Sequence, residues 1–575
     1  MEDKGLNMKD NSNIRIRSWS QFIVILAIAV TAVIISSFLR MRIDLTEDNR
    51  YTLSAPTHRI LSRLKNDVFI QVYLDGEMEI AFKKLKRSVK ETLDEFHISS
   101  HGKVDYEFIN PSDGKDTKER DARYDALINK GLNPINIHAR DNEGRVSQKI
   151  IFPGMIINYN GVEVPVNFLS NNTYISPEQN LLHSEEGLEY QIIQVVSTLC
   201  SDTVYRVAFI EGNKELPEIE VADATMGLAK FFTIDRGKIN GKPGILDRYA
   251  AVVVAGPETA FYEKDKLVLD QYLMNGGKIM WLLEEVKVDE DSLNYGETIA
   301  LYRPLALEDQ LFKYGVRINP SIVQDVECMQ IPMNITSGSN GKQMVYLPWI
   351  YYPKLNPSQQ SNITRNLNKV LGRFVNYIDT VGQDPEIRKT VLLSTSQNSR
   401  VVQPPLLISL KEANSPPAAE LFIKSSLPVS LLLEGRFHSA FRNRLVDDIA
   451  GEKGFRIREE SKPSKMIIVA DGDLIRNGVN SSASGPVPLP LAPDKYSGST
   501  FGNKDFFVNC LNYLVDDNGI MELRSREMKL RLLNKNLIRE YRVAIQLINV
   551  LVPVLLVIIS GLLYNFLRRK KYTGK

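Results

Sequence analysis

One segment of the sequence has the strand, sharp turn and helix that position a catalytic nucleophile in α/β hydrolases. Residues 250–257 read AAVVVAGP, and a helix is predicted at residues 263–274. A nucleophile elbow needs Ser or Cys at its tip. Here the tip carries Ala255, Gly256 and Pro257, none of which can attack a carbonyl group. The sequence therefore argues against a serine or cysteine hydrolase at this position.

A second candidate is a pair of carboxylates directly after a predicted strand at residues 465–470. Asp471 and Asp473, separated by Gly472, would lie at the carboxyl end of that strand, where α/β proteins bind ligands. They could hold a cation or a polar ligand. A plain turn followed by a helix N-cap is the simpler interpretation, because Asp is a preferred capping residue.

The histidines do not form a metal-binding motif. The sequence contains His58, His97, His101, His138, His183 and His438, and it has no H-E-x-x-H pair. His97 and His101 are four residues apart, but Gly102 follows them at the end of a predicted helix, so we expect them on the surface. No Walker A sequence or G-x-G-x-x-G follows a predicted strand, which argues against ATP binding by this chain.

The three cysteines, Cys200, Cys328 and Cys510, occur without any C-x-x-C spacing. This pattern argues against a zinc ribbon, a redox motif and a disulfide framework. At most one internal disulfide is possible, and three isolated, mostly buried thiols are the simpler expectation. The sequence thus offers no catalytic, cofactor-binding or metal-binding residue.

The composition is that of a globular protein with room for more than one core. The chain has 575 residues, and single domains usually stop growing near about 250–300 residues. Its 71 Lys and Arg residues against 69 Asp and Glu residues leave a net charge of +2, which suggests no nucleic-acid partner.

Two uncharged segments are long enough to cross a membrane. Residues 20–39 read SQFIVILAIAVTAVIISSFL, and residues 543–567 read VAIQLINVLVPVLLVIISGLLYNFL. About 20 apolar residues span a hydrocarbon core of roughly 30 Å. A cleaved signal peptide is the alternative for the first segment, but its apolar run is long and no A-x-A-like site follows. We therefore predict a transmembrane helix at each segment, the first an uncleaved signal anchor.

The side of the membrane is only weakly indicated, because nearly equal numbers of Lys and Arg flank the spans on their terminal and inner sides. Short basic tails usually stay in the cytoplasm. We therefore predict cytoplasmic tails at residues 1–19 and 568–575 and an exported central region.

The exported region should hold two α/β domains, at residues 40–180 and 181–520. The first has a strand-helix-strand-helix-strand-strand order that suits a thioredoxin-like unit, but its first strand-helix turn, Asp75-Gly76-Glu77, has no cysteine. Its first helix is predicted from the helical spacing of Ile80, Leu85, Val89, Leu93 and Phe96, and a strand is predicted at residues 148–157. In the second, apolar strands separated by helices predict a doubly wound parallel sheet of amidotransferase-like shape.

Three further segments lie between or beyond these strands. Residues 330–365 are rich in Pro, Gly, Asn and Tyr and predict an irregular excursion, and residues 478–500 predict a loop. A basic juxtamembrane segment at 521–542, helical from residue 524, should run straight into the second span. Its apolar face, Leu523, Leu530, Leu533, Leu537 and Tyr541, could lie along lipid headgroups.

Several stretches together resemble one family. They are residues 42–54, 312–326, 347–353 and 488–533, and the last contains Asn503-Lys504-Asp505-Phe506 and Asp516-Asp517-Asn518-Gly519. These stretches resemble GldG, the gliding-associated ABC-transporter auxiliary component of Bacteroidetes. The resemblance implies a membrane-tethered, substrate-binding or auxiliary subunit whose partners are a multi-span permease, GldF, and a cytoplasmic ATPase, GldA. It also implies a bacterial inner-membrane location with a periplasmic central region, and it supplies no catalytic residues.

The expected function is therefore that of a non-enzymatic accessory subunit that works by binding and by coupling to a permease. Two alternatives remain open at this stage. One is a structural scaffold of a cell-envelope complex, and the other is a degenerate periplasmic hydrolase of amidotransferase-like shape.

Overall fold

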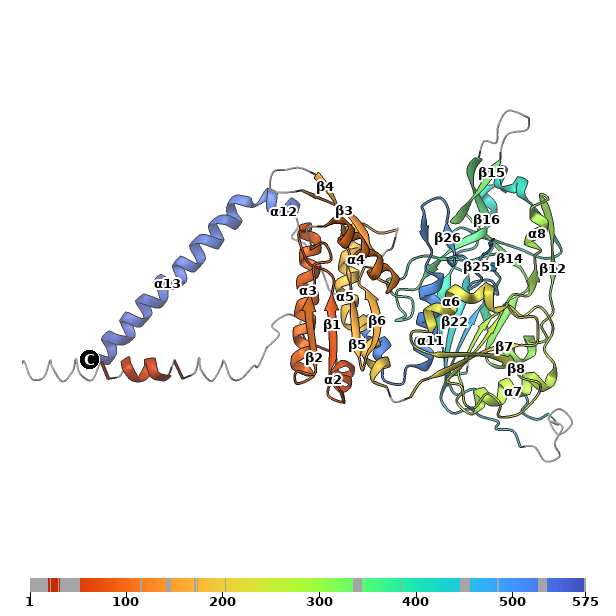
Figure 1. Ribbon diagram of the computed structural model, residues 1–575, viewed down its shortest axis with the longest axis horizontal. Coiled ribbons are helices and arrows are strands. Elements are labelled where there is room, and N and C mark those ends of the chain that lie inside the picture. The colour runs from red at the N-terminus through yellow and green to blue at the C-terminus, as the bar shows by residue number, and fades with distance from the viewer. Residues whose placement is uncertain are drawn as a thin grey trace, which may run out of the picture. The chain divides into compact units, whose positions relative to one another are not determined.

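The computed structural model describes residues 19–20, 22–28, 30–31, 52–113, 116–140, 146–169, 172, 174–201, 203–334, 344–382, 384–444, 456–482, 485–525 and 535–572. The chain divides into two units, Met1–Arg526 and Glu527–Lys575 (Figure 1). Of the predicted first span, the described residues up to 31 are helical, and residues 32–39 lie outside the described part.

The first part of the larger unit is built on a four-stranded sheet. Its elements are α2 (Ala55–Leu61), β1 (Val68–Val72), α3 (Ile80–Ser99), β2 (Val104–Phe108), α4 (Thr117–Asn129), β3 (Ile135–Arg140), β4 (Val146–Ile151), β5 (Gly154–Tyr159), β6 (Val162–Asn167) and α5 (Pro177–Cys200). The sheet order is β2-β1-β5-β6, with β1 and β2 parallel and the other neighbours antiparallel. Residues 148–157, predicted as one strand, form parts of β4 and β5, because Pro153 lies between them and lacks a backbone N–H.

Helix α3 shows why the helical prediction was sound in this part. Leu85, Val89, Leu93 and Phe96 recur at helical spacing and are fully buried in the core that α3 shares with β1 and α5. Ile80, which the same pattern included, is 87% exposed because it lies at the first position of the helix.

The second part contains a ten-stranded mixed sheet. Its first elements are β7 (Arg206–Glu211), η1 (Glu218–Val221), α6 (Ala222–Leu228), β8 (Thr233–Lys238), β9 (Ala251–Ala255), α7 (Glu263–Met274), β10 (Ile279–Leu282), β11 (Val286–Lys287), α8 (Glu290–Leu293), β12 (Glu297–Tyr302), α9 (Glu308–Lys313), β13 (Val316–Asn319) and β14 (Ile322–Asp325). They are followed by β15 (Cys328–Asn334), β16 (Met344–Pro357), β17 (Val370–Leu371), β18 (Tyr377–Thr380), β19 (Ile387–Ser394), β20 (Ser399–Val402), β21 (Leu406–Ser409), η2 (Leu410–Ala413), η3 (Ala419–Leu421), β22 (Pro428–Gly435), β23 (Ser464–Val469), α11 (Asn503–Val515) and η4 (Ile520–Ser525).

The prediction of a parallel sheet is correct for only about half of this large sheet. The strand order is β15-β16-β19-β22-β23-β10-β9-β7-β8, and the five strands from β23 to β8 are parallel neighbours. The strands from β22 to β15 run antiparallel to their neighbours. A parallel neighbour needs a long crossover, usually a helix, and no described helix of crossover length joins β15, β16, β19 and β22. The sheet is therefore mixed.

The parallel half is covered on both faces, as its apolar strands predict. Val253 and Ala255 of β9 belong to a core that includes α6 and α11, whereas Val252 and Val254 belong to a core that includes α7. Consecutive strand residues point to opposite faces, so a strand without polar positions needs cover on both sides.

Residues 330–365 were predicted to be irregular, and this prediction was wrong. They contain most of β15 and all of the 14-residue strand β16. Trp349 and Tyr351 of β16 are almost fully buried. Prolines at 348, 353 and 357 misled the sequence analysis, because β16 changes partners along its length, from β15 to β17 and β19, and so tolerates residues that donate no hydrogen bond.

The loop predicted at residues 478–500 is also partly ordered. It contains two short hairpins, one of β24 (Val479–Ser482) with β25 (Gly485–Pro488) and one of β26 (Pro493–Asp494) with β27 (Ser499–Thr500). Such short two-stranded pairings leave no buried face and therefore produce little periodicity in the sequence.

The smaller unit consists of α12 (Lys535–Glu540) and α13 (Arg542–Tyr572). Within the described part of the chain, Arg542–Lys570 is the one helix long and apolar enough to cross a membrane. The prediction of one straight helix from residue 524 was wrong. A bend at Tyr541 separates α12 from α13, and residues 520–525 form the 3₁₀ helix η4.

The residues of the apolar face predicted for that segment also differ in their burial. Leu523 is buried in the core around α3 and α5, whereas Leu537 and Tyr541 are exposed. Leu530 and Leu533 lie outside the described residues. Leu523 thus packs inside the protein and is not part of a face that lies along lipid headgroups, as the sequence pattern had suggested.

Candidate functional site

The elbow after β9 carries no nucleophile and is tightly packed at Gly256. Gly256 has a positive φ of 59°, and a Cβ atom built there would lie 3.1 Å from the carbonyl oxygen of Gly472 and 3.1 Å from Cγ of Leu216. The tip is therefore filled by the turn that follows β23. The two chemical candidates of the sequence analysis, far apart in the chain, lie against each other at the carboxyl edge of the parallel strands.

The Asp471 turn is structural, as the simpler interpretation predicted, although no helix follows it. Asp471 is fully buried, and its carboxylate accepts hydrogen bonds from the backbone N–H of Asp473 at 2.9 Å and of Arg373 at 3.1 Å. The residues after it form turns instead of the expected helix. Both carboxylate oxygens are thus used to hold the backbone.

Around this turn lies a network of buried and partly buried acids and arginines that the sequence did not reveal. Arg303 pairs with Glu284 at 3.0 Å, and Arg373 lies 3.8 Å from Glu290. Arg476 pairs with Glu220 at 2.6 Å and lies 3.4 Å from Asp473. The one feature of this network that the sequence showed was the pair Glu284-Glu285 shortly after the buried strand β10. The arginines come from separate loops and therefore form no sequence pattern with these acids. We call these residues, with Asp471, the acid–arginine network.

Burial shifts the titration of these acids upward. It raises the pKa of Asp471 to about 8, with the nearby Asp473 charge adding to the effect. Burial also raises the pKa of Glu285 to about 8, assisted by the charge of Glu308. The pKa of Glu284 is raised by burial and by Asp473, against the opposing effect of Arg303. Burial and the charges of neighbouring acids thus favour the protonated forms of these groups.

The histidine and cysteine predictions can be compared with the structure directly. Nδ1 of His97 lies 2.7 Å from the carbonyl oxygen of Val104, and His101 follows the helix at a positive φ of 58°. No group of three or more His, Cys, Asp or Glu side chains among the described residues is arranged to hold a metal ion. The three cysteines are free thiols, two buried and one partly buried, as predicted.

The second family-like motif of the sequence builds the turn between α11 and η4. One carboxylate oxygen of Asp516 accepts the N–H groups of Asn518 and Gly519, each at 2.9 Å, and the other accepts that of Met521 at 2.7 Å. Gly519 has a φ of 77°, which favours glycine. The motif therefore redirects the chain out of α11.

After this turn, η4 fastens the second part of the unit to the first. Met521 and Leu523 are buried in the core that contains α5. The guanidinium group of Arg524 lies 5.3 Å from the ring centre of Tyr190 on α5, and it donates to Oδ1 of Asn509 on α11 at 3.0 Å. It also donates to the carbonyl oxygen of Arg365 at 3.1 Å. We call this contact of η4 with α5 and α11 the junction.

The first motif, Asn503 to Phe506, positions α11 itself. Asn503 is buried, and its side chain exchanges hydrogen bonds with the backbone of Leu371 while also donating to the carbonyl oxygen of Leu474. Lys504 pairs with Asp223 of α6 at 2.8 Å. Both motifs that suggested the resemblance are thus explained by the way they build and end α11.

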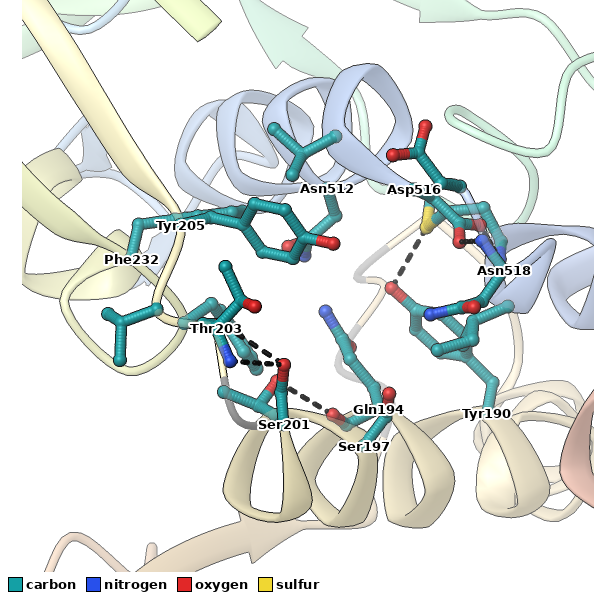
Figure 2. Close-up of a pocket in the computed structure, with 17 residues that line it drawn as sticks. Tyr190, Gln194, Ser197, Ser201, Thr203, Tyr205, Phe232, Asn512, Asp516 and Asn518 are labelled. Atoms are coloured by element: carbon teal, nitrogen blue, oxygen red, sulfur yellow. Dashed lines mark hydrogen bonds between the residues drawn. The ribbon is translucent and has the colours of Figure 1, made fainter. Parts of the chain in front are cut away.

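A cavity of about 130 Å³ opens beside the junction (Figure 2). Its walls come from the last turns of α5 and the segment after it, from the two phenylalanines before β8, and from the end of α11 with the following turn. Figure 2 shows Gln194 of α5 and Tyr205 pointing into the cavity from different walls. Sequence reasoning could not find this site, because its lining comes from three distant segments and no single one carries a pattern.

Two family models match the chain, one within each part of the larger unit. The family described as an ABC-type uncharacterized transport system, an auxiliary component, matches residues 205–510, which is more than half of the chain. A domain of unknown function, DUF7088, matches residues 47–158. No curated protein matches the chain. Among solved structures, the mmIFT52 N-terminal domain is similar at 14% identity over 54% of this chain and 96% of that chain, with a TM-score of 0.30.

Proposed function

The chain belongs to the family of ABC-type transport-system auxiliary proteins, and we propose that it is a non-enzymatic, membrane-anchored subunit that couples an exported binding region to a permease and an ATPase. The family match over residues 205–510 is the observation that carries this proposal. The apolar helix within α13 supports the anchor, since 29 residues from Arg542 to Lys570 exceed the length needed to cross a bilayer.

The finer parts of the proposal rest on the resemblance to GldG. They are a gliding-type transporter, a GldF-like permease and a GldA-like ATPase as partners, and a bacterial inner-membrane location with residues 40–542 in the periplasm. A second span at residues 20–39 would complete this topology. The first part of the larger unit would be a thioredoxin-like domain without a C-x-x-C motif, and the second an amidotransferase-like domain with a mixed sheet.

A role without catalysis is supported by the elbow. An amidotransferase-like hydrolase would need a nucleophile at the tip of the elbow, where this chain has Gly256, and the close contacts of its Cβ position with Gly472 and Leu216 disfavour a side chain there. A passive scaffold of the cell envelope would also lack a nucleophile, but it would need no permease. The two proposals therefore differ in their membrane partners.

The topology can be tested with reporter fusions to the full chain. We expect a fusion after residue 571 to report the cytoplasm and a fusion at an exposed site of the large unit, such as after Tyr295, to report the opposite side. Tyr295 is 94% exposed, so an insertion there should leave the fold intact. A cytoplasmic signal at residue 295 would refute an exported region.

Association with a permease can be tested at Gly561. The Cβ position of Gly561 meets no atom within 4 Å, so a neighbouring helix could approach closely there. We expect Gly561→Leu to reduce co-purification with a multi-span permease and its ATPase by roughly fivefold or more, since small residues permit the close packing that drives helix association in lipid.

The matched control is Ile559→Leu, which changes the same helix without filling a small position. It should leave co-purification unchanged, and both variants should keep the unfolding temperature of the large unit. Recovery of no permease with the unmodified chain would favour the scaffold. Equal recovery with both variants would refute the packing role of Gly561.

A further inference from the structure

The cavity beside the junction offers hydrogen-bonding groups that the described protein does not use. The side-chain amide of Gln194 and the hydroxyl group of Tyr205 have no hydrogen-bond partner in the part of the chain that the structure describes. Both point into the cavity (Figure 2). An amide offers donors and an acceptor, and a phenol offers one of each. A bound molecule could therefore both donate and accept hydrogen bonds here.

The cavity also has an aromatic wall. Phe231, Phe232 and Tyr205 are among the residues that line it. Aromatic rings offer flat apolar faces that pack well against another ring. The site thus combines a flat apolar wall with polar groups at its edge, which is the usual composition of a small-molecule site.

The charged side chains around the cavity, in contrast, already have partners within the protein. Both carboxylate oxygens of Asp516 accept backbone N–H groups, and Asp517 pairs with Lys278 at 3.2 Å. No lysine or arginine is among the residues that line the cavity. An anion would find no cation in the lining, and a cation would find only carboxylates that already have partners, which are backbone N–H groups for Asp516 and Lys278 for Asp517. Burying an unpaired charge is strongly unfavourable, so the cavity should reject both.

We propose that this cavity binds an uncharged small molecule with one flat apolar face and with hydrogen-bonding groups on its edge. Gln194 and Tyr205 recognise the polar edge, and Phe231 and Phe232 contact the apolar face. The cavity volume of about 130 Å³ limits the bound part to a single ring with its substituents. This inference rests on the proposed function, because it assigns a ligand class to a substrate-binding-like subunit.

The position of the cavity gives binding a structural consequence. Tyr190 of α5 donates a hydrogen bond from its hydroxyl group to Sδ of Met521 in η4 at 3.1 Å, which is part of the junction. Both residues also line the cavity. A ligand held between α5 and the turn after α11 stabilises their contact, since binding to the folded form alone raises its stability. Occupancy should therefore slow the opening of η4.

The experiment uses benzamide as the neutral probe and benzoate and benzylammonium as charged probes of similar shape. Binding to the full chain in detergent is measured by ligand-detected nuclear magnetic resonance titration. We expect benzamide to bind, and both charged probes to bind at least about tenfold more weakly. Hydrogen exchange of residues 520–525 should slow when benzamide is present. Equal binding of benzamide and benzoate would overturn the proposal.

Variants assign the binding to the cavity. Gln194→Leu and Tyr205→Phe each remove one hydrogen-bonding group while keeping the shape, and each should weaken benzamide binding by about fivefold. Gln191→Leu, one turn away on α5 and outside the cavity lining, is the matched control and should bind as the unmodified chain does. Unfolding temperatures confirm that all three variants fold.

Benzamide binding that neither cavity variant changes would overturn the proposed site. Co-purification with the permease is measured on the same variants, because it tests the proposed function separately. Weakened benzamide binding with unchanged co-purification supports the cavity and leaves the subunit role standing. Weakened benzamide binding in a chain that recovers no permease still supports the cavity, while the subunit role fails.

Discussion

Replacement of Asp270 by Ala should lower the free energy of unfolding by about 4 kcal/mol, because several buried donors lose their acceptor at once. The carboxylate of Asp270 is fully buried. It accepts hydrogen bonds from the hydroxyl group of Tyr314 at 2.8 Å, the hydroxyl group of Ser439 at 2.7 Å and the backbone N–H of Ala440 at 2.8 Å. These groups come from separate parts of the chain, so Asp270 joins α7 to the segment after β22.

Equilibrium unfolding in urea of the chain in detergent measures this effect. The control is Glu258→Ala, because Glu258 is exposed and surface substitutions usually change stability by less than about 0.5 kcal/mol. A change at Asp270 as small as that at Glu258 would show that its hydrogen bonds do not contribute to the fold.

The second large effect is a loss of stability as the pH rises. The folded-state pKa of Glu285 is raised from 4.5 to about 8, and that of Asp471 from 3.8 to about 8. The folded state therefore holds these protons more tightly than the unfolded state. The stability this contributes is complete below the unfolded-state pKa values and is lost as the pH rises to about 8.

The size of this effect follows from the shifts. Each pKa unit corresponds to about 1.4 kcal/mol, so even half of one shift predicts a loss of about 2 kcal/mol between pH 5 and pH 8. Thermal unfolding at pH 5, 6.5 and 8 measures the loss. Glu285→Gln removes one of the two titrating groups, and we expect this variant to be more stable than the unmodified chain at pH 8 and similar to it at pH 5.

A pH dependence as steep in Glu285→Gln as in the unmodified chain would show that Glu285 does not titrate in this range. Asp471→Asn offers a less clean comparison, because an amide oxygen can replace only one of the two carboxylate oxygens that accept the N–H groups of Asp473 and Arg373. That variant should therefore lose stability at pH 5 while its pH dependence becomes weaker.

Much of the local structure could be predicted from the sequence, because it depends on neighbours along the chain. The spacing of Leu85, Val89, Leu93 and Phe96 predicted the buried face of α3. The apolar run of β9 predicted a strand covered on both faces, and the helix predicted at residues 263–274 agrees with α7. Lengths and periods of this kind follow from backbone geometry alone.

The absence of a nucleophile at the elbow could also be predicted from the sequence, because it depends only on residue type. Ala255, Gly256 and Pro257 cannot act as nucleophiles whatever surrounds them. Only the tertiary structure shows why Gly256 stands there, because its neighbours Leu216 and Gly472 come from distant segments.

The strand β16 and the juxtamembrane segment depended on tertiary contacts. The prolines of β16 suggested irregular chain, but β15, β17 and β19 supply its pairing partners. Leu523 belongs to a basic, apparently amphipathic segment, yet the core around α5 buries it. Propensity and pattern describe what a segment prefers alone, and burial against distant partners can outweigh that preference.

The acid–arginine network and the junction cavity were decided by the tertiary structure alone. Glu284, Asp471 and their arginine partners approach one another because parallel strands place their carboxyl ends at one edge of the sheet. Gln194, Tyr205 and Asn512 share a cavity only because η4 packs onto α5. The sequence by itself determined many of the helices and strands and the apolar helix within α13, since these depend on local order. Side chains from distant segments meet only after the elements have packed, so their position was decided by the fold.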